Sequence, residues 1–166
     1  ELSEIADFFS IGTNDLSQYF FAADRGNARV WPLANPIQPV FLRFLKQIVG
    51  EARAHNKWIG ICGEMAGEPK LLPLMLGLGF DEISGAVPNV GALKRRVASL
   101  RLEDCEKLLQ QAIASRSAEE VEALLANAPP AATSVPLLST ELVVTSSDST
   151  SKEEVIRELV DAVYVA

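Results

Sequence analysis

Short apolar segments alternate with helix-like patterns along the chain. Residues 5–12 and 57–63 are apolar runs, each closed by a glycine, and this predicts two buried strands of a parallel sheet. A weaker third strand is predicted at residues 80–84. Over residues 36–56 apolar side chains recur every three or four positions, which predicts an amphipathic helix between the first two strands.

Helical patterns also follow the second and third strands. We predict one helix over residues 68–78, opened by Pro69, and another over residues 89–100, with Asn89 as a candidate N-cap. Two further helices are expected over residues 102–115 and 117–127. The order strand, long loop, helix, strand, helix, strand, helix predicts a parallel sheet or a (β/α) barrel. A complete (β/α)₈ barrel takes about 250 residues, so the chain is either a small open sheet or part of a barrel.

The composition changes after residue 127. Residues 128–139 are rich in Pro and Ala and are predicted to be a linker between a first domain, residues 1–127, and the start of a second, truncated domain at 140–166. The second domain is expected to open with a strand at 141–145 and a helix. Both ends of the chain are expected to be truncated, because no Met begins it and an apolar periodic stretch ends it.

Composition narrows the function classes. The 166 residues are 48% hydrophobic, which predicts a packed core. Their formal charge is −7. The dense basic cluster, Lys94 to Arg96, is expected on a solvated helix face, so nucleic-acid binding is not expected. Apolar runs are too short to insert into a membrane. Two cysteines are too few for a disulfide framework, and we expect a cytoplasmic location.

Candidate chemistry lies where the strands end. Asn14 and Asp15 follow the first strand and Cys62 closes the second, so neighbouring parallel strands would bring them to one edge of the sheet. The Asp15 carboxylate suits Mg²⁺, the Asn14 amide suits an oxyanion, and Arg25 suits phosphate or carboxylate. This set favours a small phosphorylated acid as the ligand. The alternative is that Asn14 and Asp15 only cap a turn.

The two cysteines have different surroundings. Cys62 is either a core thiol or, if partly accessible, a proton donor or nucleophile. Cys105 lies among acidic residues that would raise the pKa of its thiol, so it is interpreted as structural. His55 is expected in the last turn of a helix, where a cation complements the helix dipole.

Two segments carry a family resemblance. Asp7-Phe-Phe-Ser-Ile-Gly-Thr-Asn-Asp-Leu-Ser-Gln-Tyr19, followed by Asp24-Arg-Gly-Asn27, resembles the second signature of phosphoenolpyruvate-utilising enzymes. A second motif, Gly60-Ile-Cys-Gly-Glu-Met-Ala-Gly67, is similar to their active-site cysteine loop. Its distance along the chain from the first motif matches the family pattern. The form of the first motif that ends in Asp24-Arg-Gly-Asn27 resembles enzyme I of the bacterial sugar phosphotransferase system.

The resemblance implies an α/β fold, the C-terminal part of a (β/α)₈ TIM barrel, about strands six to eight, followed by C-terminal helices. It also implies that Asn14 and Asp15 bind phosphoenolpyruvate, that Asp15 ligates Mg²⁺, and that Arg25 grips the phosphate. Cys62 would be the general acid that protonates the enolate of pyruvate. The histidine that accepts the phosphoryl group lies on another domain in the family, and His55 does not match its motif. The isolated chain is therefore expected to be inactive, and its open sheet edges to make it poorly soluble.

The C-terminal segment adds a second resemblance. Residues 138–144 and 151–159 resemble the opening strand and helix of a fructose-type IIA domain, as in a multiphosphoryl transfer protein that fuses enzyme I to IIA. The partners implied are phosphoenolpyruvate, an HPr-type phosphocarrier protein, a fused or separate IIA domain, and a second copy in a homodimer. Two alternatives stay open: a nucleotide-dependent pyruvate phosphate dikinase or phosphoenolpyruvate synthase, and a non-catalytic regulatory module.

Overall fold

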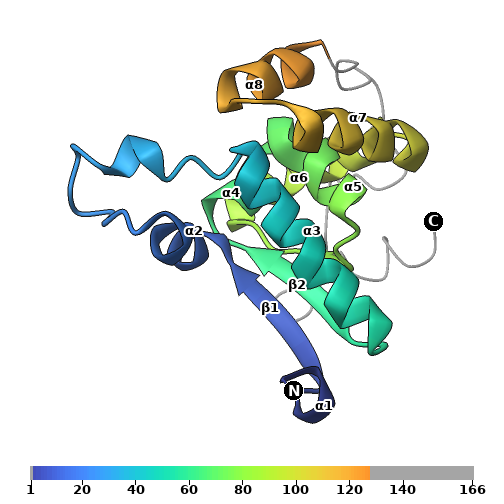
Figure 1. The fold of residues 1–166 in the computed structure, drawn as a ribbon. Coiled ribbons are helices and arrows are strands. Elements are labelled where there is room, and N and C mark those ends of the chain that lie inside the picture. Colours follow the sequence, from blue (N-terminus) through green and yellow to red (C-terminus); the bar gives the residue numbers. More distant parts are fainter. Residues whose placement is uncertain (1, 128–166) are drawn as a thin grey trace, which may run out of the picture. The chain divides into compact units, whose positions relative to one another are not determined.

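A three-stranded parallel sheet forms the centre of the fold. The computed structural model describes residues 2–127; the predicted linker, 128–139, and the predicted second domain, 140–166, lie outside the described residues. Strands β1 (Phe8–Gly12), β2 (Trp58–Cys62) and β3 (Glu82–Ile83) pair in the order β1-β2-β3 (Figure 1). All three predicted strands are confirmed, as is their parallel arrangement.

The first strand begins later than predicted. Leu2–Ile5 forms a short helix, α1, in which the carbonyl of Leu2 accepts a hydrogen bond of 2.9 Å from the N–H of Ala6. The prediction of strand from residue 5 is therefore wrong, because Ile5 is the exposed end of this helical turn rather than a buried strand residue.

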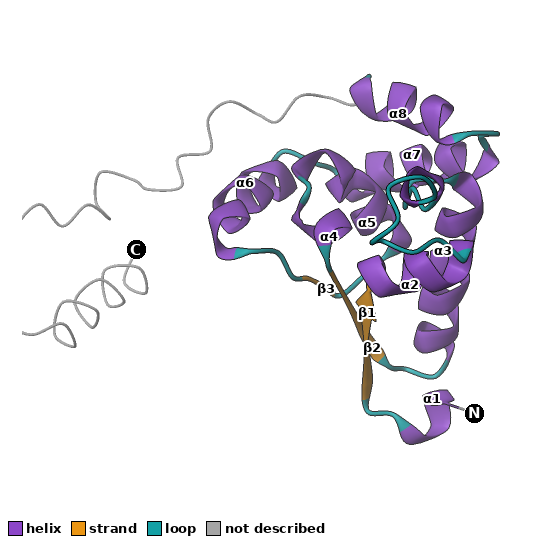
Figure 2. Cartoon of the chain, turned by 90° about the vertical axis from the view of Figure 1, so that its left-hand side faces the viewer, coloured by secondary structure: helices purple, strands orange, loops and turns teal. Residues whose placement is uncertain are grey.

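Helices cover one face of the sheet. The side chains of Ile59 and Ile61 on β2 are completely buried beneath them, in the same core as Phe41 and Leu45 of α3. Figure 2 shows α3 running alongside the strands. The helices of the described chain are α2 (Thr13–Phe21), η1 (Trp31–Leu33), α3 (Pro39–Ala54), α4 (Glu64–Gly67), η2 (Pro69–Leu71), α5 (Leu72–Leu78), α6 (Val87–Ala98), α7 (Leu102–Ala114) and α8 (Ala118–Ala126).

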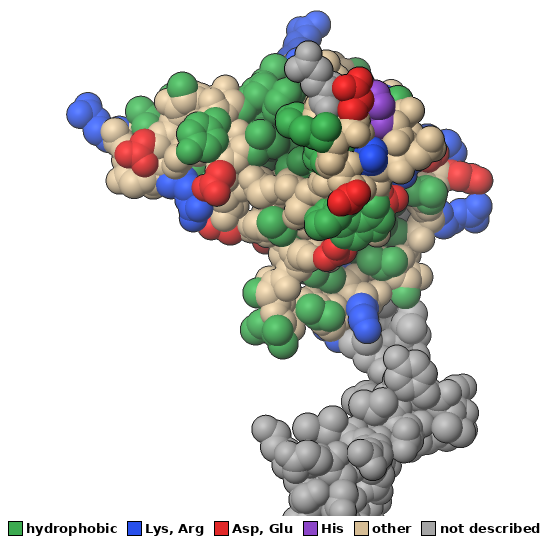
Figure 3. All heavy atoms as spheres, turned by 90° about the horizontal axis from the view of Figure 1, so that it is seen from below, with side chains coloured by type: hydrophobic (Ala, Val, Ile, Leu, Met, Phe, Trp, Pro, Cys, Tyr) green, Lys and Arg blue, Asp and Glu red, His purple; other side chains and the backbone are tan. Residues whose placement is uncertain are grey.

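The opposite face of the sheet is open. Phe8 and Trp58, which are register partners on β1 and β2, remain 60% and 42% exposed and pack edge to face with ring centroids 5.7 Å apart. Further hydrophobic side chains are visible on the surface seen from below, where α1 lies (Figure 3). Parallel sheets usually have both faces covered, so this uncovered face is what part of an α/β barrel would present. Which barrel strands these are stays a prediction.

The sequence pattern does not predict α2. The pattern predicts a long loop after β1, but Thr13–Phe21 forms α2, and Asn14 and Asp15 lie in its first turn. Phe20 and Phe21 of α2 pack on Phe41 of α3, with ring centroids 5.3 and 5.7 Å apart. This tertiary contact stabilises a helix whose sequence begins with turn-forming residues.

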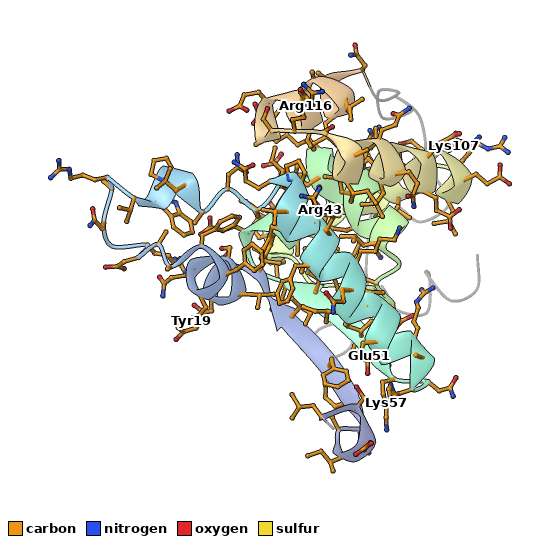
Figure 4. All side chains as sticks on the ribbon, viewed as in Figure 1. Tyr19, Arg43, Glu51, Lys57, Lys107 and Arg116 are labelled. Atoms are coloured by element: carbon orange, nitrogen blue, oxygen red, sulfur yellow. The ribbon has the colours of Figure 1, made fainter. Side chains whose placement is uncertain are left out.

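The C-terminal helices agree with the sequence pattern, with two local corrections. Arg96 is buried, not on a solvated face, and α6 begins at Val87, so Asn89 is not its N-cap. Arg43, at the end of α3 nearest α7 (Figure 4), donates a hydrogen bond of 2.6 Å to the Ile113 carbonyl and so ties these two helices together. No helix in residues 2–127 is long and apolar enough to cross a membrane.

Candidate functional site

The ends of β1 and β2 lie side by side. Gly12 and Cys62 are register partners, and α2 and α4 begin immediately beyond them and contact one another (Figure 1). The buried Thr13 hydroxyl donates a hydrogen bond of 2.8 Å to the Cys62 carbonyl. This bond fixes the start of α2 to the end of β2, so the candidate residues of both segments share one edge of the sheet, as predicted.

Gly63 makes the turn that leaves β2. Its φ of 101° and ψ of −170° place it in a region that is essentially restricted to glycine. A Cβ atom at this position would lie 2.5 Å from the Thr13 hydroxyl oxygen and 3.1 Å from Asn14 Oδ1. The missing side chain therefore lets the turn pass directly against α2, and this turn carries Glu64 to the site.

Glu64 contacts two of the candidate residues. Its backbone N–H donates to Asn14 Oδ1 at 3.1 Å, and its Oε1 accepts from Asn14 Nδ2 at 3.5 Å. The same Oε1 lies 3.5 Å from Arg25 Nη2 in an ion pair. Asn14 and Arg25, which come from different segments, thus meet at a single carboxylate oxygen. The side chain of Asn14 is thus bonded to Glu64 across the site rather than to a backbone N–H of its own turn.

Arg25 makes two further contacts, one with α2 and one with Trp31. Its backbone N–H donates to Gln18 Oε1 at 3.0 Å, which ties the loop to α2. Its guanidinium lies over the Trp31 ring, 6.0 Å from the centroid, a cation–π arrangement. The side chain nevertheless remains 44% exposed, so its guanidinium can still reach a ligand.

A hollow of about 660 Å³ opens beside this cluster. Its volume is within the range of about 300–1,000 Å³ usual for small-molecule sites. The first turns of α2 and α4 and the connection from β3 to α6 contribute its lining: Asn14, Gly63, Glu64, Gly67, Glu68, Ser84, Gly85, Ala86 and Asn89. Cys62, Asp15 and Arg25 are not part of this lining, although Arg25 pairs with Glu64 at its edge.

Asp15 is the residue expected from the sequence to ligate a metal ion. It is exposed in the first turn of α2 and makes no ion pair with the part of the chain that the structure describes. Among residues 2–127 there is no group of three or more His, Cys, Asp or Glu that could hold a metal ion. One carboxylate is still compatible with Mg²⁺, which is commonly held by one or two carboxylates together with substrate phosphates and water.

The two cysteines differ in exposure. Cys62 is partly buried at the end of β2, whereas Cys105 is 1% exposed beneath α5. Burial raises the pKa of the Cys105 thiol; Arg96 lowers it, and Asp104 raises it. The predicted direction is confirmed, but burial, not the acidic neighbours, is the largest cause.

We expect a thiol reagent such as iodoacetamide to modify Cys62 before Cys105 in the folded protein near neutral pH. The reason is that the reactive thiolate is disfavoured at Cys105 and its sulfur is covered. Peptide mapping by mass spectrometry measures the two rates, with the unfolded protein in denaturant as the reference. Equal rates at both cysteines in the folded state would contradict the described difference in burial.

Sequence reasoning missed three contributors to this cluster. Glu64 was only part of a motif, Thr13 was not considered separately, and Trp31 was not linked to Arg25. The available signal for Glu64 was a carboxylate that follows the end of one strand while an arginine follows the neighbouring strand. His55 follows the last residue of α3 and its Nδ1 lies 3.0 Å from the Glu51 carbonyl, in line with its interpretation as a helix-terminal residue.

Comparison with known proteins agrees with the motifs at the strand ends. Residues 1–102 match the model of the family described as PEP-utilising enzyme, PEP-binding domain, where PEP is phosphoenolpyruvate. The chain belongs to this family. Within it, the chain is 50% identical over 153 residues to multiphosphoryl transfer protein 1 of Escherichia coli, which covers 92% of the chain and 18% of that protein.

Two other relatives show the same relation. Multiphosphoryl transfer protein 2 of Escherichia coli is 45% identical over 163 residues, 98% of this chain and 20% of that protein. The phosphoenolpyruvate-protein phosphotransferase of Mycoplasma pneumoniae is 44% identical over 124 residues, 75% of this chain and 22% of that protein. This PEP-binding domain chain therefore spans about a fifth of the length of these curated relatives.

Proposed function

We propose that this chain is the substrate-binding segment of a longer phosphoenolpyruvate-protein phosphotransferase, the enzyme I step of the sugar phosphotransferase system. The reaction would move the phosphoryl group of phosphoenolpyruvate to a protein histidine and release pyruvate. The observation that carries this proposal is the meeting of Asn14 and Arg25 at the edge of the sheet where Cys62 ends β2. The family membership supplies the substrate class.

In this proposal Asn14 and Arg25 bind the anionic groups of phosphoenolpyruvate. Arg25 offers a forked cation for the phosphate, and Asn14 offers an amide N–H to an oxygen. The Arg25 side chain lies over Trp31, its backbone is bonded to Gln18, and the Asn14 side chain is bonded to the backbone of Glu64, so both residues lose less freedom when a ligand binds.

Asp15 would hold Mg²⁺ together with oxygens of the substrate and of water. When bound, the ion supplies charge stabilisation for the oxygens that become negative as the phosphorus–oxygen bond breaks. Asp15 has no competing ion pair within the described part of the chain, so its carboxylate is free for this role.

Cys62 would complete the reaction as a proton donor. Loss of the phosphoryl group leaves the enolate of pyruvate, and the thiol would give its proton to the methylene carbon, which forms the methyl group of pyruvate. The position at the end of β2 supports this role, because reactive groups of parallel α/β folds gather at the carboxyl ends of strands. The thiolate would then recover its proton from water.

We further propose that residues 128–139 link this domain to a IIA-like domain that starts at residue 140. The matches to the two multiphosphoryl transfer proteins extend over 153 and 163 residues, whereas those to the phosphoenolpyruvate-protein phosphotransferases of Mycoplasma pneumoniae and Staphylococcus carnosus cover 124 and 115. The longer matches support a shared C-terminal extension. A tethered IIA domain would raise the local concentration of the next phosphoryl acceptor. We also propose that the full-length protein acts with an HPr-type carrier, forms a homodimer and is cytoplasmic.

The proposal is tested by pyruvate release from phosphoenolpyruvate. The full-length protein is incubated with Mg²⁺ and an HPr-type carrier, with and without AMP plus phosphate. We expect release that depends on the carrier and does not respond to the nucleotide. Release that requires nucleotide would assign the protein to the dikinase or synthase class, and the absence of release under both conditions would favour a regulatory module.

A further inference from the structure

One carboxylate oxygen contacts both groups that the proposed function assigns to the substrate. Glu64 Oε1 lies 3.5 Å from Arg25 Nη2 and 3.5 Å from Asn14 Nδ2. Among residues 2–127, no other carboxylate pairs with Arg25 or bonds to the Asn14 side chain. A cation and an amide N–H that converge on one anionic oxygen form the same arrangement that would bind a phosphate or carboxylate of a ligand.

We propose that Glu64 is an internal counter-anion that the substrate displaces. This inference rests on the proposed function. In the structure the Glu64 carboxylate holds the Arg25 guanidinium and the Asn14 amide where an anionic group of phosphoenolpyruvate is to bind. When the substrate enters, its anionic group takes these contacts and the Glu64 side chain moves into solvent. Glu64 is thus a positioning residue that sets substrate affinity, not a catalytic one.

The contacts of the carboxylate are weak enough to be exchanged. The two charged side chains are 44% and 74% exposed, and a single oxygen serves both partners at 3.5 Å. Exposed pairs of this kind contribute little net stability, because water screens them and both side chains lose freedom. A phosphate carries more charge and more acceptor oxygens than a carboxylate, so it forms the stronger contacts with a guanidinium.

The backbone keeps the site ordered after the exchange. The Glu64 N–H donates to Asn14 Oδ1 at 3.1 Å, and this bond does not depend on the side chain of Glu64. Arg25 likewise keeps its contact with the Trp31 ring and its backbone bond to Gln18. The displaced carboxylate therefore leaves behind an amide and a guanidinium that still face the space it occupied.

Two roles for Glu64 predict opposite changes in substrate affinity when its charge is removed. If the carboxylate competes with the substrate, Glu64→Gln removes the competing charge but keeps the size and the backbone bond, and phosphoenolpyruvate binds more tightly. If the carboxylate instead had to stay on Arg25 to orient it in the bound state, the same variant would bind phosphoenolpyruvate more weakly. We expect the first result, with a Kd about two- to fivefold lower, as the weak competing pair implies.

The test measures Kd by calorimetric titration of phosphoenolpyruvate, with Mg²⁺ and without any carrier, into the full-length protein. Glu68→Gln is the matched control, because Glu68 lines the same hollow and carries the same charge but contacts neither Arg25 nor Asn14. We expect it to change Kd less than Glu64→Gln does. In an Arg25→Ala background the gain from Glu64→Gln is expected to shrink, because the exchanged ion pair is already gone. In steady state, Glu64→Gln is expected to lower KM and leave kcat within about twofold, as loss of a ground-state competitor would.

The outcomes distinguish a failure of the exchange alone from a failure of the proposed function. Unchanged or weaker binding in Glu64→Gln, an equal gain in Glu68→Gln, or a full gain that persists without Arg25 would overturn the exchange while phosphoenolpyruvate still binds. Failure of the unaltered protein to bind phosphoenolpyruvate would overturn the exchange and the proposed function together.

Discussion

Replacing Cys62 by alanine is expected to lower the rate of pyruvate release by about 10²–10⁴-fold, which is the usual contribution of a general acid. The variant removes the only proposed proton donor for the enolate carbon, while Asn14 and Arg25 keep their contacts with Glu64. Phosphoenolpyruvate should therefore still bind. Stopped assays of pyruvate formation, together with calorimetric titration of the substrate, measure the two effects separately.

Cys105→Ala is the matched control for this experiment. Cys105 is the other cysteine of the chain, and it is buried beneath α5, away from the strand ends. Its replacement is expected to lower the melting temperature and to leave the rate of pyruvate release nearly unchanged. A Cys62→Ala protein that releases pyruvate at close to the normal rate would exclude this thiol as the proton donor.

Gly63→Ala is expected to destabilise the fold and to abolish substrate binding. The backbone conformation at φ 101° costs an alanine about 1–3 kcal/mol. In addition, the new Cβ would meet the Thr13 hydroxyl at 2.5 Å, which would break the bond that joins α2 to β2. Urea unfolding measures the loss in the free energy of unfolding, and substrate titration measures the loss of the site.

Gly50→Ala provides the comparison, because a Cβ at Gly50 meets nothing within 4 Å and the residue lies inside α3. An alanine there should stabilise the helix by roughly 0.5–1 kcal/mol. The two Gly→Ala variants are thus expected to shift stability in opposite directions. Equal unfolding midpoints for both would show that the turn at Gly63 does not need its left-handed conformation.

Much of the framework could be predicted from the sequence because the signals are local. The apolar runs that end in glycine at Gly12 and Gly63 mark β1 and β2, and the three- and four-residue spacing of apolar side chains marks α3. The placement of Asn14 and Cys62 at one edge follows from the parallel pairing of two neighbouring strands. These features depend on periodicity and topology, which a single sequence carries.

The remaining features depend on contacts between distant residues. The start of α2 has the composition of a turn, and its helical form is set by the packing of Phe20 and Phe21 on α3. The role of Glu64 depends on the Gly63 turn and on the course of the loop that carries Arg25. Local patterns do not encode such distances, so the sequence could mark Glu64 as a candidate but could not show that Asn14 and Arg25 share its carboxylate.

We propose that residues at the ends of β1 and β2, with Arg25, form a single binding site for phosphoenolpyruvate. Calorimetric titration of phosphoenolpyruvate into the full-length protein with Mg²⁺ tests it most directly, with Arg25→Ala and Arg29→Ala compared. Both arginines lie in the same exposed loop, but in the described structure only Arg25 pairs with the site. We expect Arg25→Ala to weaken binding by about 10–100-fold, as loss of a hydrogen bond to a charged group would, and Arg29→Ala to leave binding unchanged. Equal Kd values for the two variants would contradict the proposed site.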